Sequence, residues 1–173
     1  LMATITTVTY TGPTTITLGL HATPLATSAT FIAGRESTQI DNTSNKFVDA
    51  YVSGFVTVGT TPTANTSINI YVWGSHTDIT ATNLDTLAGA DADRALTNTG
   101  VLYSLLRLAH SIPVLVNTSN IKYFMPPTSV ASLFGGVMPQ FWGLFVSHNN
   151  GAALHATAGN HVFKYTGITY TAT

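Results

Sequence analysis

Six histidines are the residues in this 173-residue chain that could most readily bind a metal ion or move a proton. His148, His155 and His161 follow one another closely, seven and six residues apart. These spacings match no common zinc signature, and single histidines are also frequent at polar strand ends and turns. The pattern therefore predicts no metal site, and nothing in the chain indicates another cofactor.

Three aspartates lie close together in a polar stretch and could in principle bind calcium. Asp91 and Asp93 are two residues apart, and Asp85 precedes them. A calcium loop of the helix–loop–helix type needs acids at alternate positions, a glycine and a distal glutamate. Here Arg94 follows Asp93 directly and no glutamate comes after it. We therefore expect these acids to be solvated side chains of a loop.

Catalytic patterns of other kinds are equally weak. Glu36 could pair with Asp41 or Asp49 as a glycosidase would require, but seven acids in the whole chain give such a pair little support. The sequence has no G-x-S-x-G nucleophile motif, and Gly135-Gly136 lacks the Lys-Ser/Thr element of a phosphate-binding loop. The prediction is that the protein is not an enzyme.

Charged residues are rare, which makes their grouping informative. Only 8% of residues are charged, and five of the thirteen lie between residues 78 and 100. A second group lies between residues 35 and 41. An arginine–carboxylate pair could fix the contact with another protein or a second copy; alternatively, Arg35 could pair locally with Asp41 or Glu36. The candidate interface residues are Arg35, Glu36, Asp41, Asp78, Asp85, Asp91, Asp93 and Arg94.

The remaining composition favours strands. The sequence contains 31 threonines but a single glutamate, and β-branched residues favour strands whereas glutamate and lysine favour helices. A surface of uncharged polar residues opposes self-association only weakly, so we expect a homodimer or homotrimer. The net charge of −1 argues against a nucleic-acid partner, and the absence of cysteine excludes disulfides and thiolate sites.

Short β-favouring segments recur along the chain, separated by Gly, Pro, Asn and Thr. Residues 47–59 alternate, and Val48, Ala50, Val52, Gly54, Val56 and Val58 form the cleaner buried face. Residues 67–73 place Ile68, Ile70 and Val72 together, and we expect the two segments to form an antiparallel hairpin across the turn at 61–65. Further strands are expected at 4–10, 14–18, 29–32, 121–125, 141–147 and 162–171.

Three segments are less regular. Residues 78–100 predict a long loop with at most one helical turn, a kind of loop that usually has a binding or assembly role. Residues 101–112 fit either a helix or a strand, and a strand is the prediction. Residues 129–134 indicate a helical turn ended by Gly135-Gly136. Together these features predict one all-β domain over residues 1–173, an antiparallel β-sandwich of jelly-roll type with about nine or ten short strands and little helix.

One uncharged tract, residues 123–163, has to be considered as a membrane segment. Its most apolar part, Val130–Val146, is 17 residues long and contains three glycines and Pro139. A membrane-spanning helix needs about 20 predominantly apolar residues without such a break. We therefore expect no membrane association.

Two long stretches of the chain resemble a known class of protein. They read FIAGRESTQIDNTSNKFVDAYVSGFVTVGTTPTANTSINIYVW and SVASLFGGVMPQFWGLFVSHNNGAALHATAGNHVFKYTGITY. They resemble the small β-rich capsid cement or decoration proteins of tailed bacteriophages, from about Ala29 onward apart from the 78–100 loop. The resemblance implies a jelly-roll or related β-sandwich that assembles as a dimer or trimer on the outer capsid surface and bridges major capsid subunits. It implies a location in the virion and carries over no catalytic residue.

Two alternatives of other classes remain open. A carbohydrate-binding β-sandwich of a receptor-binding apparatus would use Trp73, Trp142, Tyr71 and Tyr103 if they form an exposed row. A cupin-like metalloenzyme would need two histidines and a carboxylate at close spacing on strands. A glycan array and a metal analysis would distinguish these two classes from a capsid protein.

Overall fold

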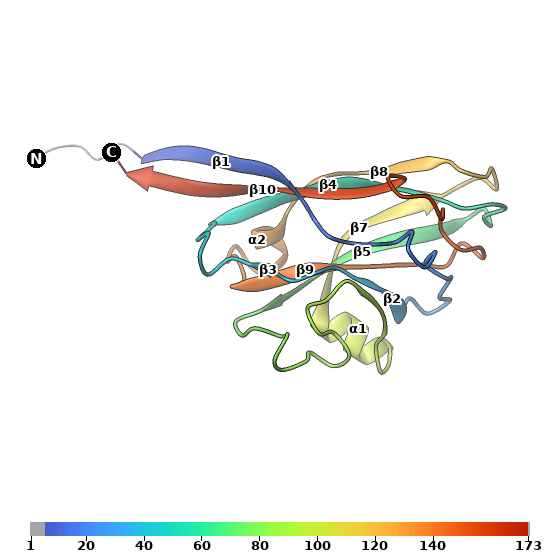
Figure 1. Ribbon diagram of the computed structural model, residues 1–173, viewed down its shortest axis with the longest axis horizontal. Helices are drawn as coiled ribbons and strands as arrows, with labels where there is room; N and C mark the ends of the chain where they lie inside the picture. The colour runs from blue at the N-terminus through green and yellow to red at the C-terminus, as the bar shows by residue number, and fades with distance from the viewer. Residues whose placement is uncertain (1–5, 173) are drawn as a thin grey trace, which may run out of the picture.

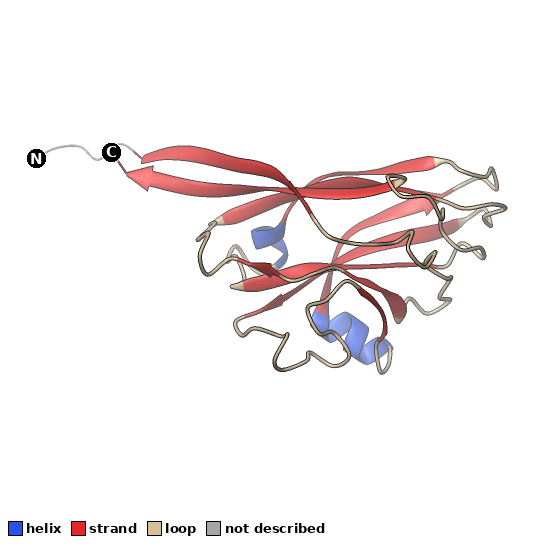
Figure 2. Ribbon diagram, viewed as in Figure 1, coloured by secondary structure: helices blue, strands red, loops and turns tan. Residues whose placement is uncertain are grey.

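The computed structural model describes residues 6–172, which form two antiparallel sheets packed face to face (Figures 1 and 2). Sheet A has the strand order β1 (Thr6–Thr15), β10 (His161–Ala172), β4 (Asp49–Thr57), β8 (Lys122–Ser129). Sheet B has the order β6 (Ala92–Ala95), β2 (Ala33–Glu36), β9 (Phe141–His148), β5 (Thr66–Ser75), β7 (Leu106–Val114), and β3 (Ile40–Asp41) also pairs with β9. The helices are α1 (Thr99–Leu105) and α2 (Val130–Leu133). The predicted all-β antiparallel sandwich with little helix is confirmed.

The strands pair in a nested order. β1 pairs with β10 and β4 with β8 in sheet A, whereas β2 pairs with β9 and β5 with β7 in sheet B. Setting aside the short strands β3 and β6, the first strand thus pairs with the last, the second with the next to last, and so on inward. The first and last strands, β1 and β10, therefore lie side by side in sheet A (Figure 1).

The main core lies between the two sheets. Alternation on β4 buries Ala50, Val52 and Val56, and alternation on β5 buries Ile68, Ile70 and Val72, as the sequence predicts. The predicted hairpin between these strands is wrong, because β4 pairs with β10 and β8 while β5 pairs with β7 and β9. The turn at 61–65 crosses from one sheet to the other, so the two apolar faces meet across the core.

A second core covers the other face of sheet B. Trp73 on β5 and Phe145 on β9 are fully buried there, although their neighbours along each strand point into the main core. They share a cluster with Leu87 and Leu96, from the segment 78–100 that the sequence assigns to a loop, and with Leu102 of α1. This segment carries β6 and the start of α1, so it covers sheet B and is not simply an exposed loop.

Several predicted boundaries differ from the observed ones. The expected strands at 4–10 and 14–18 are a single strand, β1, which passes through Gly12-Pro13 with a register shift and ends at Thr15. Residues 4 and 5 lie outside the described part. Residues 29–32 form a turn that precedes β2. The expected strand at 121–125 extends as β8 through Pro126-Pro127, which an edge strand tolerates because it has a free side.

The ambiguous segment at 101–112 combines both alternatives. Asn98 caps α1 by accepting a hydrogen bond from the Val101 N–H, and the chain becomes extended at Leu106 to form β7. The predicted helical turn is α2, followed by Gly135 and Gly136 at positive φ. β9 is the predicted central buried strand. In the described part of the chain, no helix is long and apolar enough to cross a membrane.

Candidate functional site

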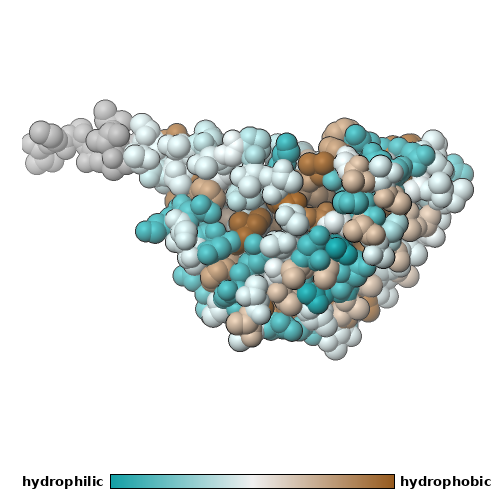
Figure 3. All heavy atoms as spheres, in the orientation of Figure 1, coloured by the Kyte–Doolittle hydropathy of each residue, from teal (hydrophilic) through white to brown (hydrophobic). Residues whose placement is uncertain are grey.

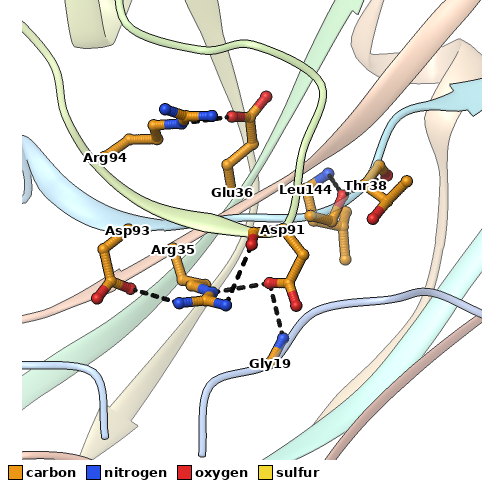
Figure 4. A network of polar contacts seen from close by, with 9 residues as sticks. Gly19, Arg35, Glu36, Thr38, Asp91, Asp93, Arg94 and Leu144 are labelled. Atoms are coloured by element: carbon orange, nitrogen blue, oxygen red, sulfur yellow. Dashed lines mark hydrogen bonds and ion pairs between the residues drawn. The ribbon is translucent and has the colours of Figure 1, made fainter. Parts of the chain in front are cut away.

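Five of the eight charged candidates come together where β2 meets β6. The register places Arg35 opposite Asp93 and Gly34 opposite Arg94. Because successive residues of a strand point to opposite faces, Arg35 and Glu36 lie on different faces of sheet B. Arg35 pairs with Asp91 and Asp93, and Glu36 pairs with Arg94 (Figure 4). We call this group of five residues the charged cluster.

Glu36 fastens the 78–100 segment to sheet B. Its carboxylate is completely buried and accepts hydrogen bonds from Arg94 Nε at 2.9 Å and from the N–H groups of Ala88 at 3.0 Å and Gly89 at 2.7 Å. A buried charge is tolerated only when it is paired and hydrogen-bonded, and these three donors meet that condition. The next residue, Ser37, accepts the Leu144 N–H and continues the attachment to β9.

Arg35 makes the second attachment on the opposite face. Its Nε donates to Asp91 at 2.7 Å and its Nη1 donates to Asp93 at 3.1 Å, while Asp91 also accepts the Gly19 N–H at 2.9 Å. The hydrogen bond to Asp91 raises the pKa of Arg35 despite its partial burial. Burial alone would raise the pKa of Asp91, but hydrogen bonds from Arg35 and Gly19 hold it below its ordinary value. Both groups therefore stay charged near neutral pH.

The local alternative for Arg35 is wrong. Neither Asp41 nor Glu36 is its partner, because both of its carboxylates come from the distant 78–100 segment. This arrangement ties three parts of the chain together: β2, β6 and the segment around Gly19.

The other three predicted acids lie apart from the charged cluster and are exposed, Asp41 at the end of β3 and the other two in the 78–100 segment. Asp41 accepts the Thr43 N–H, Asp78 accepts the Thr80 N–H and Gln39 Nε2, and Asp85 accepts the Thr97 N–H. Hydrogen bonds from Thr80 and Gln39 lower the pKa of Asp78, and those from Thr97 lower the pKa of Asp85. The Asp-x-Thr spacing of Asp41 and Asp78 is a sequence signal for such turns.

Two of the histidines hold loops in place through their rings. His148 Nε2 lies 2.9 Å from the Leu25 carbonyl oxygen, and His161 Nε2 lies 2.8 Å from the His155 carbonyl oxygen. Burial lowers the pKa of both rings, although the hydrogen bonds oppose this effect. Within residues 6–172, no three histidine or acidic side chains lie close enough to bind one metal ion.

The exposed row of aromatic residues that the carbohydrate-binding alternative would need does not form. Trp73, Trp142 and Tyr71 are buried in the two cores, and Tyr103 alone is exposed, on α1. The segment over sheet B covers Trp73 and Tyr71, a burial that strand alternation alone does not reveal.

A different set of exposed apolar side chains lies on the outer face of sheet A, and sequence reasoning missed it. We call it the aromatic face: Val8, Tyr10, Tyr51, Phe124 and Tyr170. The register places Val8 opposite Tyr170 and Phe124 opposite Phe55. This face could have been found from the alternation of residues 47–59, because the less apolar side of that segment contains Tyr51 and Phe55.

Part of this face is hollowed. Tyr51, Tyr170 and Ile168 line a cavity of about 410 Å³ with Asp49 and Ser129 at its wall. Asp49 already accepts hydrogen bonds from Ser129 Oγ and the Ala131 N–H, so its carboxylate has partners within the chain. The hollow thus offers aromatic rings more than free charge.

Comparison of the chain with protein-family models, curated proteins and solved structures finds no match.

Proposed function

We propose that this protein is a structural virion protein that binds the outer surface of a phage capsid and stabilises it by bridging major capsid subunits. The observation that carries the proposal is the aromatic face: five large apolar side chains exposed on the outer face of one sheet, in a chain with 8% charged residues. Exposed apolar surface is a feature of protein interaction sites, and aromatic residues are enriched at interface centres.

The strand order supports the same proposal. A jelly roll, in which two Greek keys wrap into two packed sheets, would have a nested pairing of this kind. Jelly rolls occur in viral capsid proteins and in lectins, so this support rests on analogy between folds. It agrees with the resemblance of the sequence to capsid decoration proteins.

The charged cluster has a supporting role in this proposal. Arg35, Glu36, Asp91 and Arg94 already have partners within the chain, so they fix the shape of the 78–100 segment. The side chain of Asp93 remains half exposed, and those of Asp41, Asp78 and Asp85 are exposed. These four carboxylates are available to pair with capsid residues and so to fix the position of the protein on the capsid. Electrostatic matching of this kind gives specificity more than affinity.

The test is co-sedimentation of the purified protein with capsids assembled from the major capsid protein of the same genome. Tyr51→Lys and Tyr170→Lys should each lower occupancy by at least about tenfold, because a charge would be buried in the contact. Tyr103→Lys is the matched control, since Tyr103 is an exposed tyrosine on the opposite side of the molecule. Absence of binding by the unaltered protein, or equal occupancy of all three variants, would refute the proposal.

A carbohydrate-binding role is the second candidate, and the hollow beside Tyr51 and Tyr170 is the observation that favours it. Aromatic rings beside a few polar groups are suited to an amphipathic ligand such as a sugar ring. A glycan array would show binding to one defined glycan, and Tyr51→Ala would abolish it. Failure to bind any glycan, together with binding to capsids, would exclude this candidate.

A further inference from the structure

Sheet edges with unpaired backbone groups can pair with other chains, and three of the four edges in this sandwich are protected against it. β8 carries Lys122 and the exposed Pro126-Pro127 pair. β7 lies against β8 and contains Arg107 and Pro113, which lacks an N–H. β6 is only four residues long, and its Asp93 and Arg94 are engaged in ion pairs.

The fourth edge, β1, has none of these protections along most of its length. It is ten residues long and contains no charged residue, and the side chains of residues 7–15 are all exposed. β1 and β10 form a ribbon that projects beyond the rest of the sandwich, and its surface is neither strongly polar nor strongly apolar (Figures 1 and 3). Within residues 6–172, no strand pairs with the outer edge of β1.

We propose that β1 pairs antiparallel with β1 of a second copy of this chain, so that the two copies of sheet A form one continuous sheet. Two-fold pairing places a strand against a copy of itself, so charges of one sign near the axis would face like charges. An uncharged strand avoids that repulsion, whereas it offers nothing to match a charged partner. This inference does not depend on binding to a capsid.

The side chains of β1 also select a register. Val8 and Tyr10 lie on one face of the strand, before the register shift between Thr11 and Thr14. A two-fold axis at Thr9 places Val8 of each copy opposite Tyr10 of the other, and aromatic–β-branched pairs stabilise antiparallel strands. An axis at Val8 or at Tyr10 would instead place one of the two apolar residues opposite a threonine or glycine.

The first experiment measures the molar mass in solution. We expect a dimer by sedimentation equilibrium, and we expect Val8→Lys with Tyr10→Lys to raise its dissociation constant at least tenfold. Phe124→Lys is the control on the other edge of sheet A, because Phe124 is 67% exposed and Tyr10 is 64% exposed. A monomer at tens of micromolar, or an oligomer that responds equally to both changes, would overturn the proposal. Circular dichroism and melting curves establish that the variants are folded.

The second experiment tests the register and does not require the lysine variants. The chain contains no cysteine, so each introduced thiol is the only one. Directly opposed Cα atoms of antiparallel strands lie about 4.5–5.5 Å apart, within the range that a disulfide can bridge. Thr9→Cys should cross-link to its own copy. Thr7→Cys and Thr11→Cys should cross-link when mixed but not alone. Cross-linking that is no greater at Thr9 than at an exposed threonine outside β1 would contradict the inference.

Discussion

Removing the carboxylate of Glu36 tests most directly whether the charged cluster fastens the 78–100 segment to sheet B. The side chain is completely buried and accepts three hydrogen bonds, two from backbone N–H groups and one from Arg94. Glu36→Ala leaves these donors without their acceptor. Arg94 is 24% exposed and can regain water in part, but the Gly89 N–H lies in a buried bond and cannot.

The expected cost follows from these contacts. A buried donor that loses its partner costs about 1–3 kcal/mol, so two backbone N–H groups and a partly exposed arginine together cost about 4 kcal/mol. Breaking a buried ion pair by removing one partner costs about 3–5 kcal/mol, which agrees. For a chain of this size, about 2–4 °C per kcal/mol converts this loss into a melting temperature about 12 °C lower. Glu36→Gln keeps an acceptor oxygen and should lose roughly half as much stability.

Urea unfolding measures the free energy, and hydrogen exchange shows where it is lost. Amides between residues 78 and 96 should exchange faster in Glu36→Ala, because opening of this segment no longer breaks bonds to β2. Asp85→Ala is the control: this carboxylate is exposed and bonds to Thr97, so its loss should be much smaller. A Glu36→Ala protein within about 1 kcal/mol of the unaltered one, a loss typical of many substitutions, would refute the reasoning.

Three other predictions concern the remaining buried groups. Burial lowers the pKa of His148 and His161 below 6.5, so the unfolded chain binds more protons than the folded chain as the pH falls through this value. The free energy of unfolding should therefore be highest above about pH 6.5 and decrease below it. In His148→Gln the melting temperature should depend less on pH. A Cβ added by Gly143→Ala would lie 2.6 Å from the Trp73 ring and should cost about 1–3 kcal/mol in urea unfolding, unless the indole moves. A chelator should leave the melting temperature unchanged, and a fall of several degrees would identify the histidines as metal ligands.

Strand faces could be predicted from the sequence, but strand partners could not. Alternation with period two places Val52 and Val56, or Ile68 and Ile70, on one face whatever their neighbours are. It contains no information on which strand lies alongside, so the short connection between β4 and β5 suggested a hairpin that does not exist. A nested order separates strands that adjoin in the chain, which explains this error.

The five residues of the charged cluster were all among the eight predicted candidates, but neither their separation from the other three nor their pairing could be predicted. Arg35, Glu36, Asp91, Asp93 and Arg94 stand out because charges are so rare in this chain. Their pairing depends on the register of β2 against β6, which places Arg35 beside two aspartates more than fifty residues away. β6 is a four-residue strand inside a polar stretch, and its own sequence carries no strand periodicity.

Once the strand order is known, the distribution of charge along the chain indicates which sheet edges are protected against pairing. No charged residue precedes Arg35, and β1 lies wholly within that uncharged tract. The edge strands β6, β7 and β8 each contain a charged residue, whereas β1 contains none. The three protected edges are therefore the charged ones, and the unprotected edge is the uncharged one. Charges on edges oppose unwanted pairing, and their complete absence from the longest edge therefore favours pairing there. We therefore expect the charged cluster to hold the fold together and β1 to be the edge at which a second copy can pair.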